Sequence, residues 1–467
     1  MINITPQGKQ AEVFALPAKG HLVVLGTAGS GKTTIALLRA YHLANLDNNK
    51  VLLVTFNAAL VQYMKDICGT VPDNLTIENY HKFARGYLNC RGKMPNRNGI
   101  LSHNSKLSLI EQAIEICKNC YPNQSTLRRN KEFFYDEITF IEQFGFENED
   151  EYYKAERIGR ASANIKRENR HWIYLVFEQY KTLRLSNGFN YDWDDLAYYT
   201  YQELKKDDTP RVYNHIIVDE GQDFSPMMIK SLVRAVRENG SFTFMGDVAQ
   251  QIYGSRLSWR DAEISTERIW KFQINYRNPG TISDFAYDIT KSKFWIHTND
   301  MIEPESKIAE GPKPILINFK SSDSELAWVV GKAIEVSEKS TTVIICRTRS
   351  DIDDYACALW KKGKDYTVIR KDTKIHIENG KIYLTTFHSA KGLEFDHVFI
   401  PRLTSEKLPD PDIINSATST ESALSDELKL LYVAVTRSKY GLYMTYSGTL
   451  SELFPSNSTN YIRHEKE

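Results

Sequence analysis

Residues 26–33 read GTAGSGKT and stand between an apolar run, HLVVL, and a helix-period stretch, IALLRAYHLA. A glycine-rich loop of the form G-x-x-x-x-G-K-T that follows a strand and opens a helix is a phosphate-binding P-loop. Its glycines let backbone N–H groups turn inward around phosphates, and the dipole of the following helix adds favourable charge. This segment therefore predicts a nucleotide site on a parallel α/β sheet.

The polar side chains of the loop have distinct expected tasks. We expect Lys32 to reach the β and γ phosphates of the nucleotide and Thr33 to bind Mg²⁺. The other nucleotide-contacting positions predicted in this segment are Gly26, Ala28, Gly29, Ser30, Gly31 and Thr34.

Two carboxylates follow another apolar strand, IIVDEGQD, as Asp219 and Glu220. Since ligands of parallel sheets bind at the carboxyl ends of the strands, this pair and the P-loop should share one edge. We expect Asp219 to bind Mg²⁺ and Glu220 to orient or deprotonate the attacking water. An acidic strand end alone is usually a solubilising cap, but the neighbouring P-loop favours catalysis. After the next strand, the neutral amide of Gln250 can sense the γ-phosphate by hydrogen bonding.

Short β-branched runs alternate with helical patterns in both halves of the chain. HLVVLGT, KVLLVTF, HIIVDE and SFTFMGD occupy the first half, and TTVIICR, DYTVIR, KIYLTTFH and HVFIPRL follow residue 282. Such runs are typical of parallel sheets covered on both faces. Between residues 101 and 185 they stop and polar, helix-period sequence replaces them. We predict two parallel α/β domains with a helical insertion in the first, and a polar surface loop at residues 405–427.

Composition narrows the class of protein. The chain has 467 residues, of which 42% are hydrophobic, and a formal net charge of +0. These values indicate a globular multidomain protein whose nucleic-acid surfaces would be local basic patches. Six scattered cysteines favour reduced thiols, and no apolar run has the length of a membrane span. We expect a cytoplasmic protein with no membrane partner.

Six motifs occur in a fixed order between residues 26 and 437: GTAGSGKTT, DEGQD, GDVAQQIYG, NYRN, HSAKGLEF and LLYVAVTR. This series resembles the UvrD/Rep/PcrA class of superfamily 1 DNA helicases over nearly the whole chain. The resemblance implies two tandem RecA-like domains and the use of ATP and Mg²⁺. The implied division is a first core of residues 1–100 and 186–281, a helical accessory insertion at 101–185, a second core at 282–455 and a polar tail at 456–467.

Several nucleotide contacts follow from the resemblance alone. Gln10 stands where the family reads adenine, and Tyr276 matches the tyrosine that stacks on adenine. Arg277 matches an arginine that reaches the γ-phosphate. Thr34 departs from the family pattern, which usually has an arginine near adenine at this position.

The resemblance also assigns residues of the second half. Gly392 and Glu394 lie in the element that joins nucleotide and DNA contacts, and Arg437 matches an arginine finger. An arginine finger accelerates hydrolysis by about 10³ to 10⁵. With the P-loop on one domain and this arginine on the other, ATP would lie in the cleft between them, so hydrolysis would be tied to closure of the cleft.

Candidate contacts to DNA come from two further elements, VTFNAAL and NYHKFA, and from motif position. The candidates are Phe56, Asn57, His81, Tyr253, Trp259 and His388. Stacking of a base on an aromatic side chain is worth about 1 to 3 kcal/mol, but an aromatic after a strand is more often a core residue than a ligand-binding one. The basic run at residues 157–172 is either a solvated helix face or a surface that tracks phosphates.

The second core lacks one part of the family pattern, because only a short turn around residues 372–380 stands where an accessory subdomain is inserted in the family. We expect an ATP-driven motor on single-stranded or tailed duplex DNA, with 3′ to 5′ polarity and helicase activity. A second hypothesis is a translocase or remodeller that unwinds only with a partner, such as a nuclease in DNA repair or antiviral defence. A third, a nucleotide-gated binding module without turnover, is disfavoured by the intact catalytic set.

Overall fold

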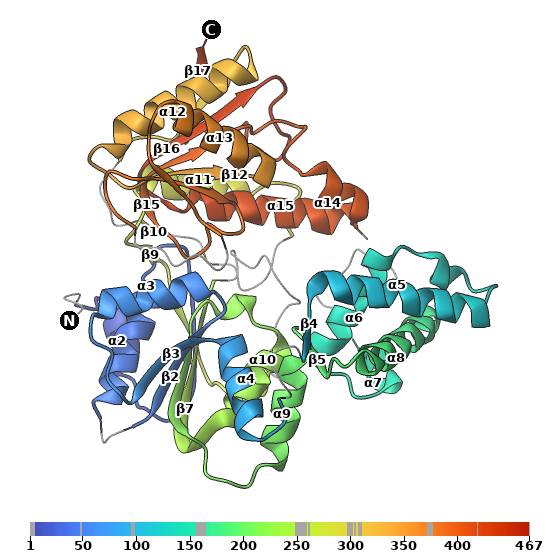
Figure 1. Ribbon diagram of the computed structural model, residues 1–467. Coiled ribbons are helices and arrows are strands. Elements are labelled where there is room, and N and C mark those ends of the chain that lie inside the picture. The colour runs from blue at the N-terminus through green and yellow to red at the C-terminus, as the bar shows by residue number, and fades with distance from the viewer. Residues whose placement is uncertain are drawn as a thin grey trace.

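The computed structural model describes residues 5–46, 49–94, 99–155, 165–247, 259, 262–296, 302, 305–306, 311–370, 377–417 and 419–466. Two parallel sheets with covering helices lie one above the other in Figure 1, and a helical block lies beside the first sheet. The predicted tandem RecA-like α/β architecture is confirmed. In the described part of the chain, no helix is both long and apolar enough to cross a membrane.

The first sheet has six parallel strands in the order β3-β2-β6-β7-β1-β8. The strands are β1 (Gly20–Gly26), β2 (Val51–Thr55), β3 (Leu75–Asn79), β6 (Tyr213–Val218), β7 (Val236–Gly246) and β8 (Ile269–Phe272). The helices of this domain are α1 (Lys9–Ala15), α2 (Lys32–Ala44), α3 (Ala58–Cys68), α4 (Tyr80–Cys90), α9 (Leu196–Lys206) and α10 (Pro226–Ala235). All five residues of β2 are buried, because helices cover both faces of the sheet. Only β7 separates β1 from β6, so the P-loop and Asp219 leave neighbouring points of one edge.

The second sheet has seven parallel strands in the order β13-β14-β12-β15-β16-β11-β17. The strands are β11 (Ile315–Phe319), β12 (Thr342–Cys346), β13 (Tyr366–Val368), β14 (Ile382–Thr386), β15 (Phe395–Ile400), β16 (Ser438–Ser447) and β17 (Ile462–Lys466). The helices are α11 (Gly280–Thr290), α12 (Ser322–Ser337), α13 (Arg349–Lys361), α14 (Pro411–Ser416) and α15 (Thr420–Val435). A short pair, β9 (Ile274–Asn275) with β10 (Glu305–Ser306), lies where the chain passes between the domains.

The helical block consists of α5 (His103–Cys120), α6 (Lys131–Phe144), α7 (Glu149–Lys154) and α8 (Arg170–Ser186). It has its own apolar core, which includes Ile110, Phe134 and Ile138. A two-stranded ladder of β4 (Ile100–Leu101) and β5 (Tyr191–Asp192) stands at both chain crossings between the block and the first sheet.

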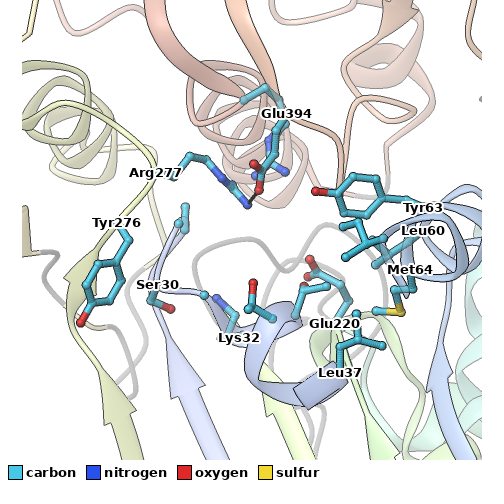
Figure 2. A pocket seen from close by; sticks show the side chains of 18 of the residues that line it. Ser30, Lys32, Leu37, Leu60, Tyr63, Met64, Glu220, Tyr276, Arg277 and Glu394 are labelled. Atoms are coloured by element: carbon cyan, nitrogen blue, oxygen red, sulfur yellow. Dashed lines mark hydrogen bonds and ion pairs between the residues drawn. The ribbon is translucent and has the colours of Figure 1, made fainter. Parts of the chain in front are cut away.

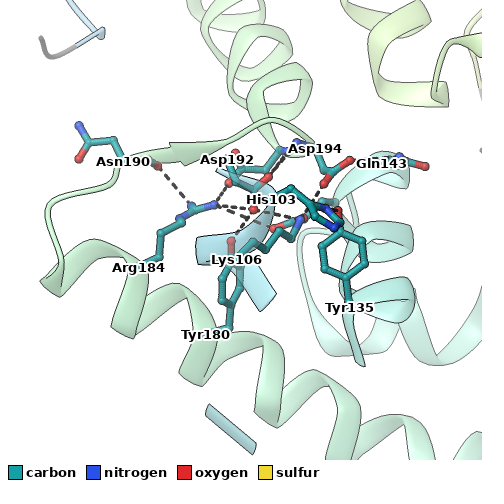
Figure 3. A network of polar contacts seen from close by, with 11 residues as sticks. His103, Lys106, Tyr135, Gln143, Tyr180, Arg184, Asn190, Asp192 and Asp194 are labelled. Carbon is teal, nitrogen blue, oxygen red and sulfur yellow. Dashed lines mark hydrogen bonds and ion pairs between the residues drawn. The ribbon is translucent and has the colours of Figure 1, made fainter. Parts of the chain in front are cut away.

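A buried network of charges ties the base of this block together (Figure 3). Lys106 Nζ lies 2.5 Å from Glu142, 3.1 Å from Asp192 and 2.8 Å from Asp194, and Arg184 pairs with Asp195. Burial, then repulsion from Asp192, raises the pKa of Glu142 well above its usual value and that of Asp195 to about 7. When Glu142 and Asp195 are protonated, the two remaining negative charges, on Asp192 and Asp194, balance the positive charges of Lys106 and Arg184.

The stretch expected as a surface loop at residues 405–427 is largely helical, so that expectation was wrong. The Asp410 side chain accepts from Asp412 N at 3.0 Å and begins α14, whose first residue is proline. Ser419 accepts from Ser422 N at 3.2 Å and begins α15. N-capping residues and a proline at the first helical position are start signals, and they outweigh the polar composition.

The polar tail expected at residues 456–467 is also not separate from the second sheet. Residues Ile462–Lys466 form β17, which pairs with β11 from Ile315↔Ile462 to Phe319↔Lys466. All five side chains of β17 are exposed. Charged residues on a sheet edge discourage further pairing, and this explains why the strand has the composition of a tail.

Candidate active site

The P-loop wraps the start of α2 in the way its glycines require. Gly29 and Gly31 have φ values of 73° and 79°, which L-residues with side chains rarely adopt. A Cβ at Gly29 would lie 2.1 Å from Asn275 Oδ1, and one at Gly31 would lie 2.7 Å from Gln10 Nε2. The loop is therefore packed between the segment that carries Gln10 and the segment that carries Tyr276 and Arg277.

Lys32 points back over this loop. Its Nζ donates to the carbonyl oxygens of Gly26 and Thr27 at 2.9 and 2.8 Å and lies 3.7 Å from Asp247 Oδ2. The side chain is buried at the floor of the cleft (Figure 2). Its ammonium thus lies at the mouth of the P-loop, where a phosphate chain would lie.

Thr33 and Asp219 form a pair suited to a hard cation. Thr33 Oγ1 donates to Asp219 Oδ2 at 2.7 Å. Asp219 is fully buried, and its Oδ1 has no hydrogen-bond partner within the described residues. Burial, then the charge of Glu220, raises the pKa of Asp219 to about 7. A buried carboxylate with an unpartnered oxygen beside a hydroxyl fits Mg²⁺, which prefers oxygen ligands.

Glu220 follows with φ 54°, in the left-handed region, so its side chain turns out of the strand direction toward the cleft. Gln222 Nε2 donates to its carboxylate, and Gln222 Oε1 accepts from Asp247 N at 2.8 Å. Burial raises the pKa of Glu220, but Lys391 and Lys32 outweigh it and hold the net pKa below the usual value. Glu220 is therefore ionised near neutral pH and can accept a hydrogen bond from water.

Charged side chains face the P-loop from the opposite side of the cleft (Figure 2). The Arg277 guanidinium pairs with one oxygen of Glu394, and Lys439 Nζ lies 3.2 Å from the other. Burial raises the pKa of Glu394, but Arg277 and Lys439 hold the net pKa below its usual value. A polyphosphate that enters the cleft competes with this carboxylate for both cations.

Arg437 follows α15 and is 1% exposed, yet it lines the same cleft. Its Nε donates to Val433 O at 2.9 Å and its Nη1 to Leu393 O at 3.4 Å. Burial, then repulsion from Arg277, lowers the pKa of Arg437 to about 10. The guanidinium is thus held by backbone carbonyls and remains a cation at neutral pH.

Asn278, the last residue of NYRN, holds the backbone on both sides of Arg437. Its amide donates to Thr436 O at 3.3 Å and to Ser438 O, and it accepts from Asn275 Nδ2 at 3.0 Å. Sequence reasoning gave Asn278 no task, because these bonds join positions about 160 residues apart.

The cleft between the two sheets encloses about 350 Å³. Its lining includes these predicted residues: Ala28, Gly29, Ser30, Gly31, Lys32, Thr33, Thr34, Glu220, Tyr276, Arg277, Gly392, Glu394 and Arg437. Gln10 stands behind the loop and donates to Ser30 O at 2.8 Å. Sequence reasoning missed Lys439 and an apolar wall on α2 and α3: Leu37, Leu60, Tyr63, Met64 and Ile67. The helical spacing of Leu60, Met64 and Ile67 gave a signal for a buried helix face but not for a cleft.

The second domain also touches the end of β6 directly. Lys391 Nζ lies 2.6 Å from Asp223 Oδ1, and both side chains are buried. Burial raises the pKa of Asp223 to about 6, although Lys391 opposes the shift. Asn57 Nδ2 donates to Lys391 O at 3.4 Å. The elements predicted to contact nucleotide and DNA therefore meet at one point of the cleft.

Three of the DNA candidates, Phe56, His81 and Trp259, lie beside other aromatic side chains. Phe56 and His81 lie edge to face with ring centroids 5.6 Å apart, and His81 packs 5.2 Å from Trp193. Trp193 is 39% exposed, and sequence reasoning missed it although a tryptophan among aspartates, in YDWDD, is unlike a core residue. Trp259 packs 5.0 Å from Phe244, and both Trp259 and Phe56 are partly buried side chains that pack against the apolar core of the first domain.

The other candidates are His388, Gln250, Tyr253 and the basic run. Burial, then Arg347, lowers the pKa of His388 to about 4, so His388 is neutral at physiological pH. Gln250, Tyr253 and the first half of the basic run at 157–172, residues 157–164, lie outside the described residues. Within that run, Arg170 is buried and donates to the carbonyl oxygens of Tyr152, Tyr153 and Ala155, so it does not belong to a phosphate-tracking surface.

Comparison with known proteins places this cleft in a family. Residues 7–275 match the UvrD/REP helicase N-terminal domain, and residues 366–449 match the UvrD-like helicase C-terminal domain. A probable DNA helicase of Mycoplasma pneumoniae is 24% identical, over 91% of this chain and 80% of its own length. A probable DNA helicase II homolog of Mycoplasma capricolum is 23% identical over 67% of this chain, which spans only 44% of that relative.

A solved structure, the C-terminal domain of a possible DNA helicase from Lactobacillus, is 24% identical and covers 40% of this chain and 98% of its own, with a TM-score of 0.30. The match to the N-terminal helicase domain extends over more than half of the 467 residues. The protein belongs to the UvrD/Rep family of ATP-dependent DNA helicases.

Proposed function

We propose that the protein is an ATP-driven motor that moves 3′ to 5′ on single-stranded DNA and unwinds duplexes from a single-stranded tail. The observation that carries the proposal is the cleft, whose volume is about 350 Å³. Lys32 and Glu220 of the first domain line one side of it, and Arg277 and Arg437 line the other. Cations on both walls make the site most favourable for a polyphosphate when the cleft is closed, so binding and hydrolysis would change how the domains sit.

The residues divide the chemistry among them. Lys32 binds the β and γ phosphates, and Thr33 with Asp219 holds Mg²⁺, which neutralises charge on the phosphate oxygens. Glu220, ionised at neutral pH, accepts a hydrogen bond from the attacking water. Arg437 and Arg277 stabilise charge that develops on the γ-phosphate.

The base and the DNA occupy two different places in this proposal. Tyr276 stacks on adenine and Gln10 reads its edge. Phe56 and His81, extended by Trp193, form an aromatic surface on which single-stranded bases stack, and Asn57 links that surface to Lys391 of the second domain. A movement of the second domain would shift Lys391 and would therefore change the contacts at both the nucleotide site and the DNA surface.

A second candidate function is a translocase whose unwinding depends on a protein partner, such as a nuclease in DNA repair or antiviral defence. β13 ends at Val368 and β14 begins at Ile382, so the chain between them is too short for a subdomain. The resemblance places the accessory subdomain of the second core at this point, and its absence favours an external factor for strand separation.

Strand displacement on duplexes with a 3′ or a 5′ single-stranded tail tests the proposal, with Lys32→Ala as the inactive control. Unwinding of the 3′-tailed duplex alone supports the 3′ to 5′ motor, and unwinding of only the 5′-tailed duplex refutes it. Displacement of streptavidin from 3′- or 5′-biotinylated single strands separates the candidates, since a partner-dependent translocase removes streptavidin without unwinding.

A further inference from the structure

Arg39 lies on α2, the helix that the P-loop opens, and its side chain crosses to the chain that ends α1. Its Nη1 lies 3.1 Å from each of the carbonyl oxygens of Val13, Phe14 and Leu16, which share its two N–H groups, and its Nη2 donates to Pro17 O at 3.2 Å. Arg39 is 1% exposed. One buried side chain of the P-loop helix therefore satisfies the carbonyls at the end of α1.

The chemistry of this contact favours a cation with donors at two positions. The last carbonyls of a helix have no partner within the helix, and the negative end of its dipole favours a cation. No carboxylate pairs with Arg39 in the part of the chain that the structure describes, so peptide dipoles alone compensate its charge. Burial lowers the pKa of Arg39 to about 10, which leaves it charged at neutral pH. A guanidinium reaches these carbonyls from two nitrogens at fixed positions, Nη1 to three of them and Nη2 to Pro17 O, whereas a lysine ammonium donates from one point and loses the second position.

The opposite end of α1 carries Gln10. The helix spans only Lys9–Ala15, so at about 1.5 Å per residue its two ends are about 10 Å apart and a shift of one end moves the other. Gln10 Nε2 donates to Ser30 O at 2.8 Å and occupies the space that a side chain at Gly31 would need. Gln10 Oε1 also accepts from Gln7 N at 3.4 Å, so the two bonds leave one N–H and one lone pair of the amide for a ligand.

We propose that Arg39 is a positioning residue that fixes the Gln10 amide beside the P-loop and thereby sets the preference for adenine over guanine. The inference rests on the proposed adenine-reading task of Gln10. Adenine presents an acceptor and an amino donor along one edge, which a glutamine amide matches, whereas guanine presents two acceptors. Thr34, which replaces an arginine of the family pattern, leaves Gln10 with a larger share of this discrimination.

Hydrolysis of ATP and GTP with saturating single-stranded DNA tests the proposal in Arg39→Lys, Gln10→Ala and the double variant. Arg39→Lys should raise KM for ATP about tenfold with kcat changed less than about twofold, because binding of the base and not of the γ-phosphate is weakened. The ratio of kcat/KM for ATP to that for GTP should fall by the same factor. In the Gln10→Ala background, Arg39→Lys should change this ratio less than about twofold, as two residues that act through one contact are not additive.

Arg170→Lys is the matched control. Arg170 Nη1 donates to the carbonyls of Tyr152, Tyr153 and Ala155 at 2.7, 2.8 and 2.9 Å and so closes α7 of the helical block as Arg39 closes α1. This variant should leave the ratio unchanged. If Arg39→Lys is not recovered folded, Arg39→Gln, which retains N–H donors, is measured in the same way.

Three outcomes separate the task of Arg39, the task of Gln10 and the proposed function. An equal loss for ATP and GTP in Arg39→Lys, or losses that add to those of Gln10→Ala, would overturn the positioning task of Arg39. Unchanged selectivity in Gln10→Ala would refute the adenine-reading task and the inference with it. Absence of ATP hydrolysis by the folded wild-type protein would instead refute the proposed function.

Discussion

Buried charges cluster both at the base of the helical block and in the cleft, and the two clusters differ in how positive and negative groups are arranged. At the base of the helical block, Lys106 has three carboxylates within 3.1 Å, so opposite charges touch and no ligand is needed. In the cleft, Lys32, Arg277 and Arg437 line the walls of an open cavity, and Lys32 and Arg437 are bonded largely to backbone carbonyls. Burial of charge therefore does not by itself mark a site. Several cations around one open cavity do indicate a binding site.

Of the substitutions in the two clusters, removal of the Glu220 carboxylate should have the largest effect on hydrolysis. Glu220→Gln keeps shape and hydrogen-bonding capacity but not the ionised group, so kcat should fall by about 10² to 10⁴. Binding of a fluorescent ATP analogue should remain within about threefold of wild type. Hydrolysis at more than a tenth of the wild-type rate would show that Glu220 does not serve the water.

The corresponding change in the helical block should affect stability alone. Lys106→Met leaves Glu142, Asp192 and Asp194 without their shared cation, and breaking a buried ion pair from one side costs about 3 to 5 kcal/mol in the free energy of unfolding. Urea unfolding measures this loss. The kcat for ATP of the fraction that stays folded should change less than about twofold. A stable variant with impaired hydrolysis would make the network part of the motor.

The sequence predicted the cleft better than its surroundings. Lys32, Thr33, Asp219 and Glu220 were predictable because P-loop spacing and strand ends place them by local geometry. Asn278 and Lys439 were not, because their partners are brought together only by the packing of two domains. The helices within 405–427 and the strand within 456–467 were missed because polar composition concealed capping residues and an edge strand.

Titration of Asp195 should make the free energy of unfolding depend on pH. Its folded pKa is about 7 and its unfolded value about 4, so the folded protein retains a proton that the unfolded chain releases. This contribution to stability is present below pH 4 and is lost as the pH rises through 7. From pH 5 to pH 8 the loss is about 2.6 kcal/mol, most of it between pH 5 and pH 7 at about 1.4 kcal/mol per unit. Asp195→Asn should show a flatter urea-midpoint profile over this range, and an unchanged profile would assign the proton elsewhere.

The smallest expected effect concerns the bonds that hold the arginine of the second domain. Asn278→Ser removes an amide that donates to both carbonyls flanking Arg437, and two net hydrogen bonds of about 0.5 to 1.5 kcal/mol each predict roughly a tenfold lower kcat. KM for ATP should change little. Steady-state kinetics with saturating DNA measures both constants, and a rise in KM without a fall in kcat would place Asn278 in ground-state binding instead.

The cleft should hydrolyse ATP in response to DNA because its two walls come from two domains. Steady-state ATP hydrolysis with Mg²⁺, with and without single-stranded DNA, tests it most directly when wild type is compared with Arg437→Ala. DNA should stimulate the wild-type rate, and Arg437→Ala should retain nucleotide binding while kcat falls by about 10³ or more. A wild-type rate indifferent to DNA, or an Arg437→Ala rate equal to that of wild type, would contradict the account.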